Sequence, residues 1–176
     1  MAIFIVTENK NAMARVVNML IDKGCHNIGL LTLTPNIFSL KERIEGYQMA
    51  LTGRNMPTND VLVRTVDHKR LKESTREELD VLIKIDADAL VFTNNLVASE
   101  AIWYLNTSHA HLVKPLKMAT FDNLDLFDYV QPRVISLAQP VDEMAQKITE
   151  ILLANINEKS AIKQHIVLNP KIIKRT

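Results

Sequence analysis

A guanidinium, a carboxylate and two amides follow four apolar segments of this chain. They belong to Arg43, Asn94, Asp122 and Gln139. If the fold brings them together, such groups can make paired hydrogen bonds to vicinal hydroxyls or to another small polar ligand. No nucleophile with a partnered base stands among them, so their chemistry indicates binding rather than catalysis.

The apolar segments alternate with helical patterns, which predicts a fold of the α/β class. Strands are predicted at residues 3–6, 27–33, 61–66, 88–93, 116–121 and 134–137, followed by a closing hairpin of 166–167 and 171–174. Helices are predicted at residues 8–23, 37–51, 71–85, 96–106 and 141–156. Apolar strands separated by helices favour a doubly wound, mostly parallel sheet with helices on both faces. Ligands of such sheets lie at the carboxyl ends of the strands, where Asn94, Asp122 and Gln139 fall, while Arg43 lies on the helix that follows the strand of residues 27–33.

Three of these residues also have a purely structural alternative. Asn94 is a good helix N-cap, and Asp122 could start a tight turn. Arg43 stands among charged neighbours that suit a solvated or ion-paired helix residue. Their shared place after successive strands favours one binding site over several unrelated roles.

The composition argues against several other classes of protein. The chain carries 21 Lys+Arg against 20 Asp+Glu, a net charge of +1, and it lacks a basic block for binding nucleic acid on its own. The single Cys25 cannot form an internal disulfide and indicates a reducing compartment. No stretch is suited to a signal peptide or a membrane span, so a soluble, cytoplasmic protein without membrane partners is expected.

Sequence motifs for metal, phosphate and nucleophile chemistry are absent as well. The histidines and the cysteine form no metal-ligand set. Neither the glycine-rich phosphate motifs nor G-x-S-x-G occurs in the chain. We therefore expect no metal, no cofactor and no enzymatic activity.

The order and spacing of five segments resemble one known family. The segments are KERIEGYQMAL, DALVFTNNLVASEAIWYL, MATFDNLDLF, VISLAQPVDEMAQKITEIL and IVLNPKIIKR, and the opening VTENKNAMARVVNMLIDKGCHNIGLL is also similar. They resemble the C-terminal part of the effector-binding region of the lactose-repressor (LacI/GalR) family of bacterial transcription regulators. The resemblance implies a periplasmic-binding-protein-like fold of type I, in which two lobes close on a small molecule, usually a sugar or sugar derivative.

The resemblance also implies roles for the polar residues. Arg43, Asn94 and Asp122 match the effector-contacting arginine, asparagine and aspartate of the family, while Gln139 lies at its lobe crossover. Asn95 stands where the family usually has Asp, so the polar pattern of the site differs.

A second departure concerns the backbone, because Thr120 stands where the family usually has Gly. The chain is also shorter than a family member, and it is expected to be a fragment without the helix-turn-helix domain. The resemblance thus implies the ligand-sensing and dimerisation portion of a transcription regulator, which binds operator DNA only through the missing N-terminal domain. A sugar-binding component of a transport system shares the fold and is the alternative.

The family arrangement divides the chain between two lobes. Residues 1–25 are expected to belong to an incomplete N-terminal lobe, with 138–162 as its hinge and helix. Residues 26–137 are expected to form the C-terminal effector-binding lobe, closed by strands within 163–176.

This division leaves two amphipathic helices without most of their sheet. The apolar stripes of residues 8–23 and 141–156 are expected to pack on one another, to pack on a second copy of the chain, or to be poorly ordered. The resemblance also implies a homodimer, with Trp103 and Tyr104 as candidate interface residues; ordinary, partly buried aromatics are the alternative.

Overall fold

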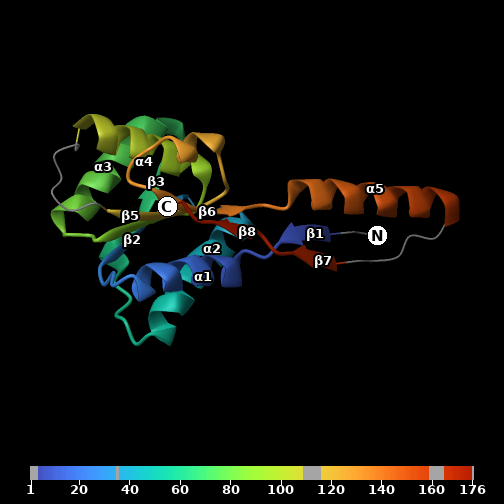
Figure 1. Ribbon diagram of the computed structural model, residues 1–176, viewed down its shortest axis with the longest axis horizontal. Helices are drawn as coiled ribbons and strands as arrows, with labels where there is room; N and C mark the ends of the chain where they lie inside the picture. The colour runs from blue at the N-terminus through green and yellow to red at the C-terminus, as the bar shows by residue number, and fades with distance from the viewer. Residues whose placement is uncertain (1–3, 35, 109–115, 159–164, 176) are drawn as a thin grey trace.

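The computed structural model describes residues 4–34, 36–108, 116–158 and 165–175, and its elements lie close to the predicted bounds. The strands are β1 (Phe4–Thr7), β2 (Ile28–Leu33), β3 (Val63–Val66), β4 (Ala89–Phe92), β5 (Lys117–Phe121), β6 (Val134–Ala138), β7 (His165–Leu168) and β8 (Lys171–Ile173). The helices are α1 (Lys10–Asp22), α2 (Phe38–Gly53), α3 (Leu71–Lys84), α4 (Asn95–Ser108) and α5 (Val141–Glu158). Figure 1 shows a layered body, from which α5, β1 and β7 extend to one side.

One sheet of six strands, in the order β3-β2-β4-β5-β6-β8, forms the centre of the body. Its strands pair in parallel except β6 and β8, which are antiparallel. Helices α1 and α2 cover one face and α3 and α4 the other (Figure 1). Side chains alternate between the two faces, so Leu30 joins the α1–α2 core while Leu31 joins the α3–α4 core. The predicted α/β class, with helices on both faces of a mostly parallel sheet, is confirmed.

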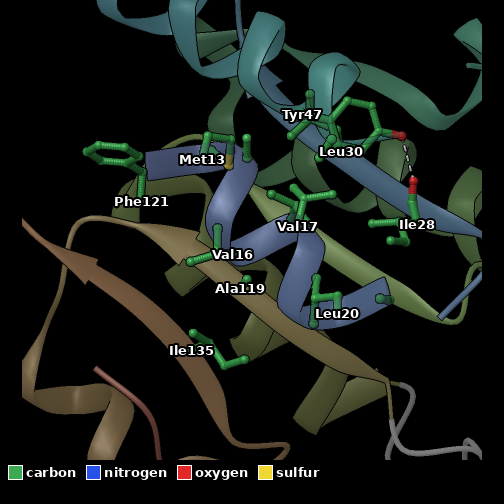
Figure 2. Close-up of a cluster of buried hydrophobic side chains, with 14 of the residues drawn as sticks. Met13, Val16, Val17, Leu20, Ile28, Leu30, Tyr47, Ala119, Phe121 and Ile135 are labelled. Atoms are coloured by element: carbon green, nitrogen blue, oxygen red, sulfur yellow. Dashed lines mark hydrogen bonds between the residues drawn. The ribbon is translucent and has the colours of Figure 1, made fainter. Parts of the chain in front are cut away.

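Helix α1 packs on this six-stranded sheet. Its apolar stripe is fully buried and consists of Met13, Val16, Val17 and Leu20. The stripe belongs to the same buried cluster as Ala119 and Phe121 of β5 and Ile135 of β6 (Figure 2). The prediction that the helix of residues 8–23 lacks a sheet is therefore wrong, because β5 and β6 supply one.

Helices α1 and α2 approach each other closely at Gly46. A Cβ at this position would collide with the carbonyl oxygen of Lys10 and lie 2.9 Å from Cβ of Met13. The next residue, Tyr47, donates its hydroxyl hydrogen to the carbonyl oxygen of Ile28 over 2.7 Å (Figure 2). Helix α2 is thus fixed against both α1 and the sheet.

A second, two-stranded sheet pairs β1 with β7 in parallel. Helix α5 packs alongside β1 (Figure 1). The predicted hairpin of residues 166–167 and 171–174 is wrong, because β7 pairs with β1 whereas β8 pairs with β6. The chain consequently passes between the two sheets after β1, after β6 and after β7.

The apolar stripe of α5 remains largely uncovered. Exposed fractions of 45% to 71% are found at Val141, Ile148, Leu152, Leu153 and Ile156. Of the predicted ways to cover this stripe, packing on α1 is wrong, because α1 is buried on the other sheet. Packing on a second copy stays a prediction.

Candidate functional site

Arg43 is held in one orientation by buried contacts. Its side chain projects from α2 and is 7% exposed. The Nε group donates a hydrogen bond of 2.9 Å to Oδ1 of Asn9, and Nη1 donates one of 2.7 Å to the carbonyl oxygen of Thr93. The guanidinium carbon lies 3.6 Å from the ring centroid of Phe121, so the cation stacks on that ring. These contacts connect the beginning of α1, the end of β4 and the end of β5.

Asp122 lies directly beside this guanidinium. Its Oδ2 is 3.8 Å from Nη1 of Arg43, and its Oδ1 accepts a hydrogen bond from Nε2 of Gln139. Burial lowers the pKa of Arg43 to about 10, and the negative charges of Asp122 and Glu42 oppose this shift. Arg43 therefore stays charged at neutral pH and forms an ion pair with Asp122.

The backbone at Asp122 turns sharply as β5 ends. Its φ of +70° is in the left-handed region, which aspartate and asparagine tolerate better than most residues. The expected turn is therefore found at this residue, while the role of its carboxylate in ligand binding stays a prediction.

Asn94 differs in role from the other three predicted residues. Its Oδ1 accepts a hydrogen bond of 3.0 Å from the backbone N–H of Val97, so it caps the beginning of α4. The preceding residue, Thr93, provides the carbonyl oxygen bound by Arg43. The structure thus brings Arg43, Asp122 and Gln139 into one connected group, and Asn94 lies beside that group as a helix cap.

An open cavity of about 510 Å³ lies at this edge of the sheet. It is lined by Asn95, Asp122, Asn123, Ala138, Gln139 and Val141. A larger cavity of about 610 Å³ lies on the outer face of α1 and α2, lined in part by Asn18, Met49 and Arg54. We favour the smaller cavity, because it combines a carboxylate with three amide side chains at the carboxyl ends of parallel strands.

The family model for the periplasmic binding protein-like domain matches residues 17–176. The chain belongs to this family. The predicted resemblance to the LacI/GalR family is confirmed by relatives of this domain. The transcriptional regulator EndR of Paenibacillus polymyxa is 23% identical over 181 residues, which cover 96% of this chain and 51% of that protein.

Solved structures show the same fold. A LacI family transcriptional regulator from Enterococcus faecium with bound ribose has a TM-score of 0.87 at 20% identity, with 99% of this chain and 64% of that chain covered. A sugar-binding LacI family regulator from Escherichia coli complexed with phosphate has a TM-score of 0.79 at 25% identity, with 96% and 60% covered. This periplasmic binding protein-like domain spans about half the length of the curated relatives it matches, 51% and 47% for two of them.

Several side chains of the domain's site were not predicted. Asn9 and Thr7 bind the predicted residues, since Asn9 holds Arg43 and Thr7 Oγ1 donates a hydrogen bond of 2.8 Å to Oε1 of Gln139. Asn9 follows β1 just as Asn94 follows β4, so the search for polar residues just after each strand could have identified it.

Asn123 lines the cavity and is held in place by two hydrogen-bond donors. Its Oδ1 accepts hydrogen bonds from Oγ of Ser136, at 2.6 Å, and from Nη2 of Arg175, at 2.8 Å. Arg175 also pairs with Asp128, at 2.6 Å, while its own side chain is 7% exposed. The cavity wall is therefore supported by the segment that follows β8.

The predicted interface residues Trp103 and Tyr104 both lie on α4, close to Arg76 of α3. Trp103 is 53% exposed. The guanidinium of Arg76 lies 4.9 Å from the ring centroid of Trp103 and 5.5 Å from that of Tyr104, and it also pairs with Glu100. The Tyr104 hydroxyl donates a hydrogen bond of 3.2 Å to Asp80. An interface role for Trp103 and Tyr104 stays a prediction.

The described part of the chain contains neither a group of metal ligands nor a membrane-spanning helix. Among those residues, no three His, Cys, Asp or Glu side chains are grouped so that they could hold a metal ion. The described helices include none that is long and apolar enough to cross a membrane.

Proposed function

We propose that this domain is the effector-sensing part of a LacI/GalR transcription regulator and that it binds a neutral, polyhydroxylated ligand such as a sugar. The observation that carries the proposal is the ion pair of the buried Arg43 with the partly buried Asp122, which Gln139 also binds, beside a polar cavity. A cation and an anion side by side offer donors and acceptors to vicinal hydroxyls without leaving a net charge for the ligand to neutralise. Relatives whose structures contain ribose or cellobiose support the ligand class.

In the proposed mechanism, binding is followed by a shift between conformations rather than by a reaction. The effector favours one relative placement of the two sheets, and this placement changes the affinity of an attached DNA-binding domain for its operator. The domain would act in the cytoplasm as a homodimer, with Trp103 and Tyr104 in the interface. The lobe that completes β1, β7 and α5 and the helix-turn-helix would belong to the rest of the full-length protein.

A thermal-shift screen tests the ligand class. D-ribose, cellobiose and inorganic phosphate are the probes, and we expect a sugar to stabilise the domain whereas phosphate does not. A ligand at about 100 times its dissociation constant adds about 2.7 kcal/mol of stability. Stabilisation by phosphate alone would contradict a neutral ligand.

Two variants show whether the stabilisation depends on the candidate site. Arg43→Ala and Asp122→Ala should each abolish the shift while retaining a cooperative unfolding transition. Arg54→Ala is the matched control, because Arg54 follows the same helix with a side chain that is 45% exposed and pairs with Asp22. An equal loss of binding in Arg54→Ala would place the ligand elsewhere.

A further inference from the structure

Five residues around the candidate site form a ring of polar contacts, in which Thr7 takes part through both its hydroxyl and its backbone carbonyl. Thr7 donates to Oε1 of Gln139 over 2.8 Å, and Gln139 donates through Nε2 to Oδ1 of Asp122. Oδ2 of Asp122 lies 3.8 Å from Nη1 of Arg43. Arg43 donates through Nε to Oδ1 of Asn9 over 2.9 Å. Asn9 in turn donates through Nδ2 to the carbonyl oxygen of Thr7 over 2.9 Å, which closes the ring.

The ring lies where the chain passes between the two sheets. Thr7 ends β1 and Asn9 precedes α1, while Gln139 follows β6, so two of the three passages contribute to it. Thr7 and Asn9 are only 6% and 5% exposed, and neither lines the cavity. Asn9 Nδ2 is also bound to Oε2 of Glu42, at 2.9 Å, which fixes the amide further. Both residues therefore act on the site through other side chains.

We propose that Thr7 and Asn9 are positioning residues that join the ligand site to the passage between the sheets. The inference deepens the proposed function and rests on it. The Thr7 hydroxyl binds Oε1 of Gln139 and so directs Nε2 toward Asp122, while the Asn9 carbonyl oxygen fixes the plane of the Arg43 guanidinium. Each charged group of the site is thus oriented by a residue from the first passage.

One contact of the ring differs from the rest. The distance of 3.8 Å between Arg43 and Asp122 exceeds that of a hydrogen bond, whereas the other contacts are within hydrogen-bonding range. A ligand hydroxyl can accept from the guanidinium and donate to the carboxylate, which joins the two groups more tightly. Because the ring includes Thr7 and Gln139, ligand binding then alters the hydrogen bond between these two residues, which joins the passages between the sheets.

Hydrogen exchange at Nε of Arg43, followed by NMR in the ligand-free domain, tests the ring. Thr7→Val removes the hydroxyl with little change in shape, and Thr7 has no direct contact with Arg43 in the ring. The ring predicts that loss of the Thr7–Gln139 hydrogen bond loosens Asp122 and Arg43, so that exchange of the Nε hydrogen becomes faster, by up to about fivefold, the change that corresponds to one whole hydrogen bond. Thr7→Ser keeps the hydroxyl and should retain the wild-type rate.

Thr120→Val is the matched control, since the buried Thr120 hydroxyl donates only to the carbonyl oxygen of Phe121. Its exchange rate at Arg43 should equal that of the wild type. If Thr7→Val does not fold, Gln139→Met breaks the same ring at a less buried residue and should give the same acceleration. An unchanged rate in these variants, or an equal acceleration in Thr120→Val, overturns the proposal. Because no ligand is added, this result is independent of the outcome of the sugar screen.

Discussion

The two sheets of this domain differ in how completely their surfaces are covered. The six-stranded sheet has helices on both faces, and α1 and α2 bury their apolar residues against it. Beside the two-stranded sheet, α5 packs alongside β1, and most of the apolar stripe of α5 is exposed. An isolated pair of strands is at best marginally stable in water, and the helix beside this pair leaves most of its own apolar stripe exposed. The six-stranded body therefore supplies most of the stability, and the small sheet contributes the polar residues that complete the site.

The largest contrast should appear when a leucine is shortened in each region. Leu20→Ala in α1 removes a fully buried side chain and should lower the free energy of unfolding by about 2 to 5 kcal/mol. Leu152→Ala in α5 removes a side chain that is 54% exposed and should change it by less than about 0.5 kcal/mol. Urea unfolding measured by circular dichroism compares the two. Equal losses would mean that α5 is as well packed as α1.

A smaller effect is expected where the two helices of the covered face meet. Gly46→Ala forces a methyl group onto the Lys10 backbone and should cost about 1 to 3 kcal/mol in the same unfolding experiment. Gly53→Ala provides the control, because a Cβ there meets no atom within 4 Å. Equal stability of the two variants would show that α1 and α2 do not approach as closely as described.

The site itself should make an intermediate contribution to stability. Arg43→Met leaves the buried Oδ1 of Asn9 and the carbonyl oxygen of Thr93 without their donor, and should cost about 1 to 3 kcal/mol. Arg54→Met, at the exposed end of the same helix, should cost less than about 1 kcal/mol, because exposed ion pairs contribute little. If Arg43→Met leaves the free energy of unfolding unchanged, the buried contacts are not formed in solution.

The smallest change in stability is expected on the uncovered stripe of α5. Ile156→Lys replaces a side chain that is 71% exposed and should alter the free energy of unfolding by less than about 0.5 kcal/mol. It should nevertheless reduce self-association in sedimentation velocity, because it adds charge to an exposed apolar surface. Lys147→Met, which removes a charge from α5, makes the opposite change and should increase self-association. Unchanged sedimentation in both variants would mean that the stripe does not take part in contacts between copies.

The strands and helices were predictable because their periodicity is local information. The apolar residues of α1 and of α5 repeat at helical spacing and indicate one face to be buried, but spacing does not say which sheet receives that face. The stripe of α1 was therefore assigned to the wrong sheet. The pairing of β7 with β1 was missed for the same reason, since short connections suggest a hairpin and contain no information on a distant parallel partner.

The candidate site was predictable in part. Their position just after strands identified Asp122 and Gln139, Arg43 was found on the helix that follows β2, and the fold connects all three. Asn94 satisfied both the binding and the capping pattern, and the cap is what its Oδ1 forms. Asn9 also follows a strand and could have been selected by position, but its contact with Arg43 joins residues 34 positions apart and follows only from the packing of α1 on α2.

A titration of the isotope-labelled domain with D-ribose and cellobiose, followed by two-dimensional NMR, tests the ligand site most directly. Binding between Arg43 and Asp122 predicts that the largest shifts occur at the Nε group of Arg43, the side-chain amide of Gln139 and the backbone of Asp122. Residues Asn18 and Met49 in the larger cavity should not shift. Shifts that gather in that cavity, or none from either sugar at saturating concentrations, would contradict a sugar site at this pair.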